Sequence, residues 1–548
     1  MTDVTSVLPL LAVAIPALAI PLVLAAGGRP NRRETWTALA GVGTFAVVLA
    51  MVQSPDTHVT TLGSYLGVEF ALRADAAGLL FALLASTLWL ATSLYSVGYM
   101  RGLDEDNQTR YFAAFAASIA ATMGVALAAD LLSLFVFYEL LTLATYPLVV
   151  HGGDAAAKAA GRRYLAYTLG GGVLVFGGLV LVGALAGTLA LAPGGIAGLA
   201  TADPTLARAA FALLVAGFGV KAAVVPLHAW LPAAMVAPTP VSGLLHAVAV
   251  VKSGAFGVTR AVLYVFGPET ASDLGLATAL AAFAAATMVL ASVVGMRQDN
   301  LKRGLAFSTI SQLSYIVLGV ALLTPLAAFG ALLHVVAHAF MKITLFFVAG
   351  VAYVETGEKY VSDLAGVGRR LPVAMTAFAI AAAGLVGFPL VAGFVSKFHL
   401  VLGAADSATP WFVAAFLLAG LLKLLYFWPI VYTAFYGGRD DDSDAGVHPF
   451  APSHHESSSD EDVSGDHVRV PTATDGGREP GTDVPSESAT TRTRDGAARF
   501  ASVAGLETSP ALLLPILFTV GMAVVLGVVP TAFPFWALAE TAVVEVFG

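Results

Sequence analysis

Long apolar runs, separated by short polar connections, fill most of the chain. A helix needs about 20 apolar residues to cross the hydrocarbon core of a bilayer. By that measure the pattern predicts about fourteen transmembrane helices. They lie near 7–26, 36–52, 76–99, 111–129, 131–150, 164–187, 205–224, 241–266, 274–295, 304–323, 326–353, 373–400, 411–436 and 510–530. The first run lacks a positive segment before it, so we interpret it as a transmembrane helix and not as a cleaved signal.

Composition agrees with an all-α polytopic membrane protein. Of the 548 residues, 58% are hydrophobic and 12% are charged. The chain has no cysteine, which excludes disulfides, thiolate-bound iron–sulfur clusters and cysteine zinc sites within it. It has no Walker phosphate loop, and GGGVLVFGG from Gly170 lies inside an apolar run, which favours helix packing. We expect no cofactor, no metal and no nucleic acid partner, and enzymatic activity of the chain by itself stays open.

Basic residues gather in the connections that follow odd-numbered helices. They are Arg29, Arg32, Arg33, Arg101, Arg110, Lys158, Arg162, Arg163, Arg297, Lys302, Arg303, Lys359, Arg369 and Arg370. Because Lys and Arg favour cytoplasmic loops, these connections are predicted to face the cytoplasm. With an even number of helices, both termini would lie outside a plasma membrane that the chain crosses many times.

Two interruptions of the apolar pattern predict an internal repeat. They are GVKAAVVPLHAWLPAAMVAPTPVS from Gly219 and GLVGFPLVAGFVSKF from Gly384. Each combines glycine, proline and lysine at membrane depth, which indicates two inverted five-helix repeats with broken helices 7 and 12. We divide the chain into N-terminal helices 1–3 (1–110), a first repeat of helices 4–8 (111–266), a second of helices 9–13 (274–436), an insertion (437–509) and a C-terminal transmembrane helix (510–548).

The insertion is rich in Asp, Glu, Ser, Thr, Gly and Pro. It has too few apolar residues to fold alone, so we expect a disordered acidic loop on the cytoplasmic side. A docking or cation-concentrating role is the alternative.

Ionisable residues inside the apolar runs carry the functional prediction. Five lysines lie there, namely Lys221, Lys252, Lys342, Lys397 and Lys423, together with Glu139. A charged group at the bilayer centre costs roughly 2.5–3.5 kcal/mol on insertion scales, so such a set indicates a protein that moves charge. Glu139 in helix 5 and Lys221 in helix 7 are natural partners, because each restores the charge of the other. A static buried salt bridge is the alternative.

His334, His338 and Lys342 follow at four-residue intervals and share one helix face. Histidine titrates near neutral pH and can pass a proton on. A proton relay, structural histidines and a metal site all fit the spacing. The glutamate of a metallopeptidase helix is absent, because Val335 follows His334. For Lys397 and Lys423, snorkelling to the surface is the alternative to a place in the relay.

Several segments resemble one known family. They are LFVFYELLTLATYPLV, PLHAWLPAAMVAPTPVSGLLHAVAVVKSG, KRGLAFSTISQLSYIVLG, HAFMKITLFFVAG and GFPLVAGFVSKF. They resemble the proton-translocating antiporter-like family of complex I membrane subunits, Mrp-type sodium/proton antiporters and membrane-bound hydrogenases. The resemblance runs from about residue 75 to residue 436 and implies fourteen core helices in two inverted halves. It implies a gating pair of Glu139 and Lys221, a central axis of Lys252, His334 and His338, and an exit at Lys397.

The resemblance implies a proton-conducting subunit of a multisubunit sodium/proton antiporter. Length and the short C-terminal part look like the D-type Mrp subunit, whereas AAMVAPTPVSGLLHAVAVVKSG also resembles the A-type Mrp subunit. The expected partners are other membrane subunits, protons, sodium ions and the lipid bilayer. The alternatives are the membrane arm of a redox-driven pump, such as complex I or a hydrogenase, and a stand-alone transporter. The cation and the direction of coupling stay open at this point.

Overall fold

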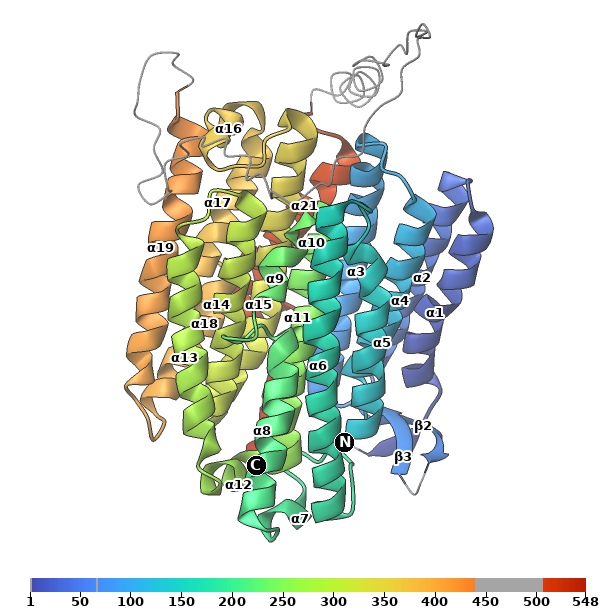
Figure 1. The fold of residues 1–548 in the computed structure, drawn as a ribbon, viewed down its shortest axis with the longest axis vertical. Coiled ribbons are helices and arrows are strands. Elements are labelled where there is room, and N and C mark those ends of the chain that lie inside the picture. The colour runs from blue at the N-terminus through green and yellow to red at the C-terminus, as the bar shows by residue number, and fades with distance from the viewer. Residues whose placement is uncertain (1, 66–67, 439–505) are drawn as a thin grey trace, which may run out of the picture.

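The protein is a bundle of long, roughly parallel helices with a small sheet at one end (Figure 1). The computed structural model describes residues 2–65, 68–438 and 506–548. Among these residues, twelve helices are long and apolar enough to cross a membrane. The predicted all-α multi-pass membrane protein is confirmed in this part of the chain.

The helices fall into four groups along the chain. The N-terminal group is α1 (Leu8–Ala26), α2 (Pro30–Val52) and α3 (Ala76–Gly102). The first repeat holds α4 (Gln108–Ala126), α5 (Leu131–Val149), α6 (Ala155–Ala186), α7 (Ala197–Ala200), α8 (Pro204–Lys221), α9 (Trp230–Ala233), η1 (Ala234–Val236), α10 (Thr239–Gly243), η2 (Leu244–Val248), α11 (Val250–Arg260), η3 (Ala261–Phe266) and α12 (Gly267–Asp273). The second repeat holds α13 (Leu276–Gly295), α14 (Leu301–Ala321), α15 (Pro325–Thr356), η4 (Ser362–Leu364), α16 (Val367–Arg370), α17 (Pro372–Val386), α18 (Ala392–Ala405) and α19 (Phe412–Tyr436). The C-terminal group is α21 (Pro510–Val528), η5 (Pro530–Ala532) and α22 (Phe535–Phe547).

Helices 7 and 12 of the sequence pattern are broken, as predicted. The first consists of α8 and, after a break at residues 222–229, α9; the second consists of α17 and, after a break at 387–391, α18. Pro226 and Pro389 lie in the two breaks and cannot donate a helical hydrogen bond. In Figure 1, α8 leads away from the end that carries both termini, whereas α17 and α18 lead toward it. The two repeats are therefore inverted.

A three-stranded sheet was not anticipated by the sequence pattern. Its strands are β1 (Asp3–Thr5), β2 (Thr57–Tyr65) and β3 (Val68–Arg73), in the order β1-β2-β3. Strand β1 is parallel to β2, and β2 is antiparallel to β3. These segments are too short and polar to cross a membrane, and they lie beside the termini in Figure 1. The sheet therefore covers one end of the bundle.

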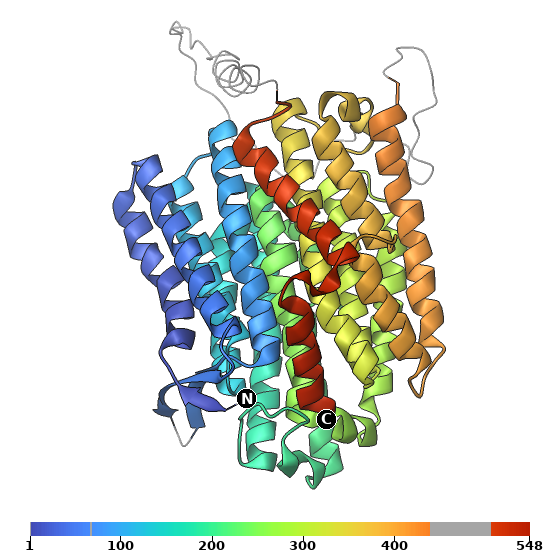
Figure 2. The same ribbon diagram turned by 180° about the vertical axis from the view of Figure 1, so that it is seen from behind.

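The C-terminal segment, expected as one transmembrane helix, is two helices. Pro530 begins η5, and Pro534 directly precedes α22. Figure 2 shows both helices crossing the back of the bundle, and they pack against α3 and α15. They thereby join the N-terminal group to the second repeat. Residues 439–505, which hold most of the predicted acidic insertion, lie outside the described residues.

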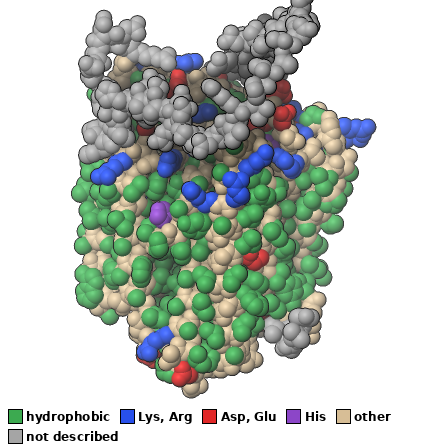
Figure 3. Space-filling view, in the orientation of Figure 1, with side chains coloured by type: hydrophobic (Ala, Val, Ile, Leu, Met, Phe, Trp, Pro, Cys, Tyr) green, Lys and Arg blue, Asp and Glu red, His purple; other side chains and the backbone are tan. Residues whose placement is uncertain are grey.

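The two ends of the bundle differ in charge. Figure 3 shows lysine and arginine side chains gathered toward the end with α16, above a broad apolar band. Both termini lie at the opposite end (Figure 1). This asymmetry in charge agrees with the prediction that the connections rich in Lys and Arg lie on one side of the membrane.

Candidate functional site: a buried line of ionisable side chains

The line begins in the first repeat with Glu139 and Lys221. The Nζ of Lys221 lies 3.9 Å from the Oε1 of Glu139 and 3.3 Å from the centroid of the Tyr138 ring. It also donates a hydrogen bond to the backbone oxygen of Tyr138. The Lys221 side chain is fully buried, whereas that of Glu139 is 20% exposed. The Oε1 of Glu139 accepts no hydrogen bond in the described residues, so the two side chains interact through their charges and not through a hydrogen bond at this oxygen.

Two glycines create the space for this pair. A Cβ at Gly172 of α6 would lie 2.5 Å from the carboxyl carbon of Glu139. A Cβ at Gly254 of α11 would lie 2.2 Å from the backbone nitrogen of Ala222, just after Lys221. Both distances are shorter than real carbon contacts. The glycines therefore let α6 approach the carboxylate and α11 approach the break. The packing role expected for the glycine-rich run of α6 fits this geometry.

The break itself is stabilised by hydrogen bonds from outside the helix ladder. The Nε1 of Trp230 donates to the oxygen of Val220 at 2.8 Å. The backbone nitrogen of Val225 donates to the hydroxyl of Thr287 at 3.1 Å. Backbone groups freed by a break need such partners at membrane depth. They fix the end of α8, and with it Lys221.

Lys252 and His338 join the two repeats. The Nζ of Lys252, on α11, lies 2.8 Å from the Nδ1 of His338, on α15. Which of the two nitrogens donates depends on where the protons lie, and when Lys252 is an ammonium group it donates and Nδ1 accepts. The Nε2 of His338 has no hydrogen-bond partner among the described residues. Both side chains are buried, and a proton can pass between them over a single hydrogen bond.

His334 lies one turn from His338, with 6.2 Å between the ring centroids. Its Nε2 hydrogen-bonds to the Oε1 of Gln312 at 2.7 Å, and its Nδ1 to the hydroxyl of Ser396 at 2.9 Å. The amide nitrogen of Gln312 donates to the oxygen of Leu385, which orients Oε1 toward the histidine. Both ring nitrogens of His334 are thus engaged, which leaves neither for a metal in this arrangement.

Tyr315 connects His334 with two lysines. Its ring centroid lies 5.3 Å from that of His334, 4.7 Å from the Nζ of Lys397 and 5.5 Å from the Nζ of Lys423. Lys397 donates to the oxygens of Leu385 and Val386 at the end of α17. It lies after the break, on α18, whereas Lys221 lies before its break. The two lysines are therefore not at equivalent positions in the repeats.

Lys423 and Lys342 are held by hydroxyl groups. Lys423 donates to Ser311 and, at 3.3 Å, to Ser292. Lys342 donates to Ser308 at 2.5 Å and to the oxygen of Leu305 at 3.1 Å. Lys342, Lys397 and Lys423 are all buried, so neither Lys397 nor Lys423 snorkels to the surface. None of these partners carries a negative charge.

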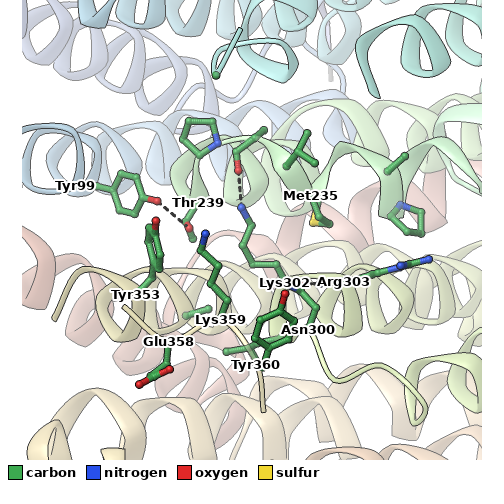
Figure 4. A pocket seen from close by; sticks show the side chains of 18 of the residues that line it. Tyr99, Met235, Thr239, Asn300, Lys302, Arg303, Tyr353, Glu358, Lys359 and Tyr360 are labelled. Atoms are coloured by element: carbon green, nitrogen blue, oxygen red, sulfur yellow. Dashed lines mark hydrogen bonds between the residues drawn. The ribbon is translucent and has the colours of Figure 1, made fainter. Parts of the chain in front are cut away.

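A cavity of about 710 Å³ lies at the basic end of the bundle and is lined in part by residues of α9 and η1. It is lined by Glu105, Arg163, Thr239, Lys302 and Lys359, among others. Figure 4 shows the side chains of Lys302 and Lys359 next to each other in it, and Lys302 donates to the oxygen of Ala237. Burial raises the pKa of Glu105, and Asp106 adds to the effect, whereas Lys302 lowers it.

Arg260, Gln312 and Ser396 escaped the sequence interpretation, whereas Asp75 lies at a helix boundary, where a cap or a surface charge was expected. Asp75 caps α3, with its Oδ1 accepting from the nitrogen of Gly78 at 2.7 Å. It also forms two hydrogen bonds of 2.7 Å with the guanidinium of Arg260, which is fully buried. The signal in the sequence that could have revealed this ion pair is Arg260, an arginine at the end of an apolar run. Gln312 and Ser396 carried no signal, because they are uncharged.

The contacts from Lys252 through His338, His334 and Tyr315 to Lys397 and Lys423 bring ionisable groups of both repeats together, and Glu139 and Lys221 form a second site that can hold a proton. Every ionisable member except Glu139 is a base, and most are held by carbonyl or hydroxyl oxygens.

Comparison with known proteins finds a family match and similar chains. The family described as NADH:quinone oxidoreductase/Mrp antiporter, TM, matches residues 128–423. NADH-quinone oxidoreductase subunit N of Desulforudis audaxviator is 34% identical over 388 residues, which cover 70% of this chain and 76% of the relative. The A/B subunit of a probable K(+)/H(+) antiporter from Rhizobium meliloti is 33% identical over 382 residues, which cover 68% of this chain but 37% of that longer protein.

A solved structure shows the same fold. A chain in the Mrp complex from Dietzia sp. DQ12-45-1b superposes with a TM-score of 0.79 at 24% identity, covering 99% of this chain and 97% of that one. The family match includes Glu139, Lys221, Lys252, His334, His338, Lys342, Lys397 and Lys423. The chain belongs to the NADH:quinone oxidoreductase/Mrp antiporter transmembrane family.

Proposed function

We propose that this chain is the proton-conducting membrane subunit of a multisubunit monovalent cation/proton antiporter. The observation that carries the proposal is the buried line of ionisable side chains through both repeats. Glu139, Lys221, Lys252, His338 and His334 form its first part, and Lys342, Lys397 and Lys423 its second. If these side chains were static ion pairs, each base would need its own carboxylate. The line contains one carboxylate, Glu139, and several basic side chains.

The mechanism is a charge-coupled relay. With Glu139 ionised, Lys221 keeps its proton; if the pair separates, both groups favour their neutral forms. Two unit charges 4 Å apart interact by about 4 kcal/mol at an effective dielectric constant of 20. That is enough to shift protonation of the pair by several orders of magnitude. A change at Glu139 is then passed on through Lys252, His338 and Tyr315 to Lys397.

The proposed cargo of this chain is the proton, with sodium or potassium bound by another subunit. Positively charged side chains repel a metal cation, and selective cation paths are lined by carbonyl or carboxylate oxygens. The cavity at the basic end is also lined mainly by lysine and arginine among its charged residues. Such a lining favours proton exchange over passage of a larger cation.

We infer the orientation of the chain in the membrane from the end of the bundle that carries most of its lysines and arginines. Lys and Arg concentrate at the cytoplasmic side of membrane proteins. We therefore assign the end with α16 to the cytoplasm and both termini to the outer face of the plasma membrane. The acidic insertion would face the cytoplasm.

The second candidate is the membrane arm of a redox-driven proton pump. The subunit N relative, a part of NADH-quinone oxidoreductase by its name, favours it. The same buried line would conduct protons in an antiporter and in a redox-driven pump, because the energy source of either complex lies in other subunits. A stand-alone transporter is disfavoured, because the large cavity lies at one end of the line and not at its centre.

The test is to purify the intact complex by a tag on this chain, identify the subunits and reconstitute it in vesicles. We expect several membrane subunits, and proton flux driven by a sodium or potassium gradient without an electron donor. Flux that requires a donor and a quinone would establish the redox pump instead. Glu139→Gln is the matched control, which should assemble and carry no flux.

A further inference from the structure

One helical segment carries polar atoms that the buried line does not use. Along α10, η2, α11 and η3, the buried side chains of His246, Ser253, Arg260 and Tyr264 each have at least one nitrogen or oxygen without a hydrogen-bond partner among the described residues. All four side chains are nearly inaccessible. They are seven, seven and four residues apart. Thr259, on the same segment, donates to its own backbone at Ala255 instead.

The spacing places Ser253 and Arg260 on one face of α11. In an α-helix, seven residues return to within about 20° of the starting direction. Ser253 and Arg260 therefore share a face of α11. The bond between Arg260 and Asp75 shows that this face meets α3. The ring of Phe81 of α3 lies 5.1 Å from the ring of Phe256 of α11, tilted against it, which places the two helices in contact one turn away.

The polar face of α11 ends beside a cluster of polar side chains near the C-terminus of the chain. The guanidinium of Arg260 lies 4.3 Å from the ring centroid of Tyr264. Glu545 of α22, which packs on α3, has a buried Oε2 without a hydrogen-bond partner among the described residues. Both carboxylate oxygens of Asp75 accept hydrogen bonds, from the guanidinium of Arg260 and from the backbone N–H of Gly78, and arginine does not deprotonate. Glu545 is therefore the member of the cluster that can exchange a proton.

A polar cavity lies close to this cluster. It measures about 430 Å³ and is lined by Asp3, Glu69, Arg73, Asp130 and Thr188, among others. The loop that lines it continues to η3, where the nitrogen of Ala192 donates to the oxygen of Tyr264 at 3.0 Å. The same loop then reaches α22, since a Cβ at Gly194 would lie 3.4 Å from the oxygen of Val546.

We infer that this polar face is a hydrated proton route of the first repeat, separate from the Lys252–His338–Lys397 line. It leads past Ser253, Arg260 and Tyr264 to Glu545 and the end of the bundle that carries the termini. Buried polar atoms without protein partners are ordinarily satisfied by water, which supplies the connection. From Ser253 to Tyr264 the route spans about 16 Å at 1.5 Å per residue. Its transport role rests on the proposed function, whereas its hydration does not.

Cysteine labelling tests the hydration. The chain has no cysteine, so Ser253→Cys introduces a single thiol at nearly constant volume. The matched control is Thr259→Cys, equally buried on the same helix but away from its polar face. In the reconstituted complex, a small water-soluble methanethiosulfonate should modify the Ser253→Cys variant roughly ten-fold faster than the Thr259→Cys variant, because thiol reactivity follows access. The readout is the mass of the peptide. Equal rates would overturn the route.

Substitution of Glu545 tests the exchange step. Glu545→Gln should lower proton flux about a hundred-fold, the lower end of the range for loss of a proton-transfer group. Glu545→Asp should restore part of the flux, and Glu540→Gln, exposed on the same helix, should leave it unchanged. Labelling of Ser253→Cys should persist in the Gln variant. Normal flux in Glu545→Gln would overturn the exchange role of Glu545. Normal flux in Glu139→Gln would instead contradict the proposed function and leave the labelling result standing.

Discussion

At the scale of single residues, the space around a charge matters as much as its partner. The carboxylate of Glu139 lies against Gly172, and any larger residue there would displace it. Gly170, two residues earlier on the same helix, has no atom within 4 Å of an added Cβ. Gly172 therefore faces the Glu139 carboxylate, whereas Gly170 faces open space on the same helix. They therefore separate an effect on the ion pair from an effect on helix stability.

We predict that Gly172→Ala lowers proton flux by at least about ten-fold, because displacing a reacting group by about 1 Å can cost a hundred-fold. Gly170→Ala should leave flux unchanged. The measurement is cation-dependent proton flux in inverted vesicles, normalised to assembled complex. Equal flux in the two variants would contradict the role of the pair.

The second residue-scale prediction concerns Lys397. Arginine can still donate to the oxygens of Leu385 and Val386, but it keeps its charge permanently. If Lys397 releases a proton during turnover, Lys397→Arg should assemble normally and lower flux at least about ten-fold. Lys158→Arg, at an exposed position of α6, is the control. Full flux in Lys397→Arg would show that the charge alone is needed.

At the scale of elements, the broken helices depend on partners for their ends. The last carbonyls of α17 accept from Lys397, so this side chain caps a half-helix as well as taking part in the line. At the other end of α17, the nitrogens of Val373 and Ala374 donate to the carboxylate of Glu507 at 2.8 and 2.7 Å. A carboxylate at a helix N-terminus is favoured by both hydrogen bonds and the helix dipole.

We predict that Glu507→Gln destabilises the protein by about 0.5–2 kcal/mol, the usual value of an N-terminal cap. The measurement is thermal unfolding of the purified complex. Flux per folded complex should be unchanged, because α17 would still form. Glu540→Gln, exposed on α22, serves as the control. A loss of flux without a loss of stability would show that Glu507 acts in transport.

At the scale of the whole molecule, the two ends of the bundle face different solutions. The described lysines and arginines outside the buried line and its surroundings lie mainly at the end with α16 (Figure 3). The other end carries the sheet and both termini (Figure 1). An even number of crossings places both termini on one side.

We predict that Thr201→Cys, in the connection between α7 and α8, reacts with a membrane-impermeant thiol reagent in intact cells. Lys158→Cys, at the basic end, should react only after permeabilisation. Both positions are exposed, and the chain has no other cysteine. The reverse pattern would invert the proposed orientation.

Much of the fold was predictable because apolar runs, proline and glycine act locally. The helices, the two breaks and the inverted repeats follow from the length of each apolar run and from the position of Pro226 and Pro389. The strands were missed because they are short and pair with distant segments. The split of the C-terminal segment was missed although Pro530 and Pro534 mark it.

The sequence by itself determined which ionisable residues lie at membrane depth, because the cost of burying charge makes Glu139 or Lys221 conspicuous in an apolar run. Only the tertiary structure decided how they connect. The hydrogen bond from Lys252 to His338 joins residues 86 positions apart, and Gln312 and Ser396 take part without any charge to reveal them. The Asp75–Arg260 pair spans 185 positions. Hydropathy is a property of each segment, whereas a hydrogen bond needs two segments placed by packing.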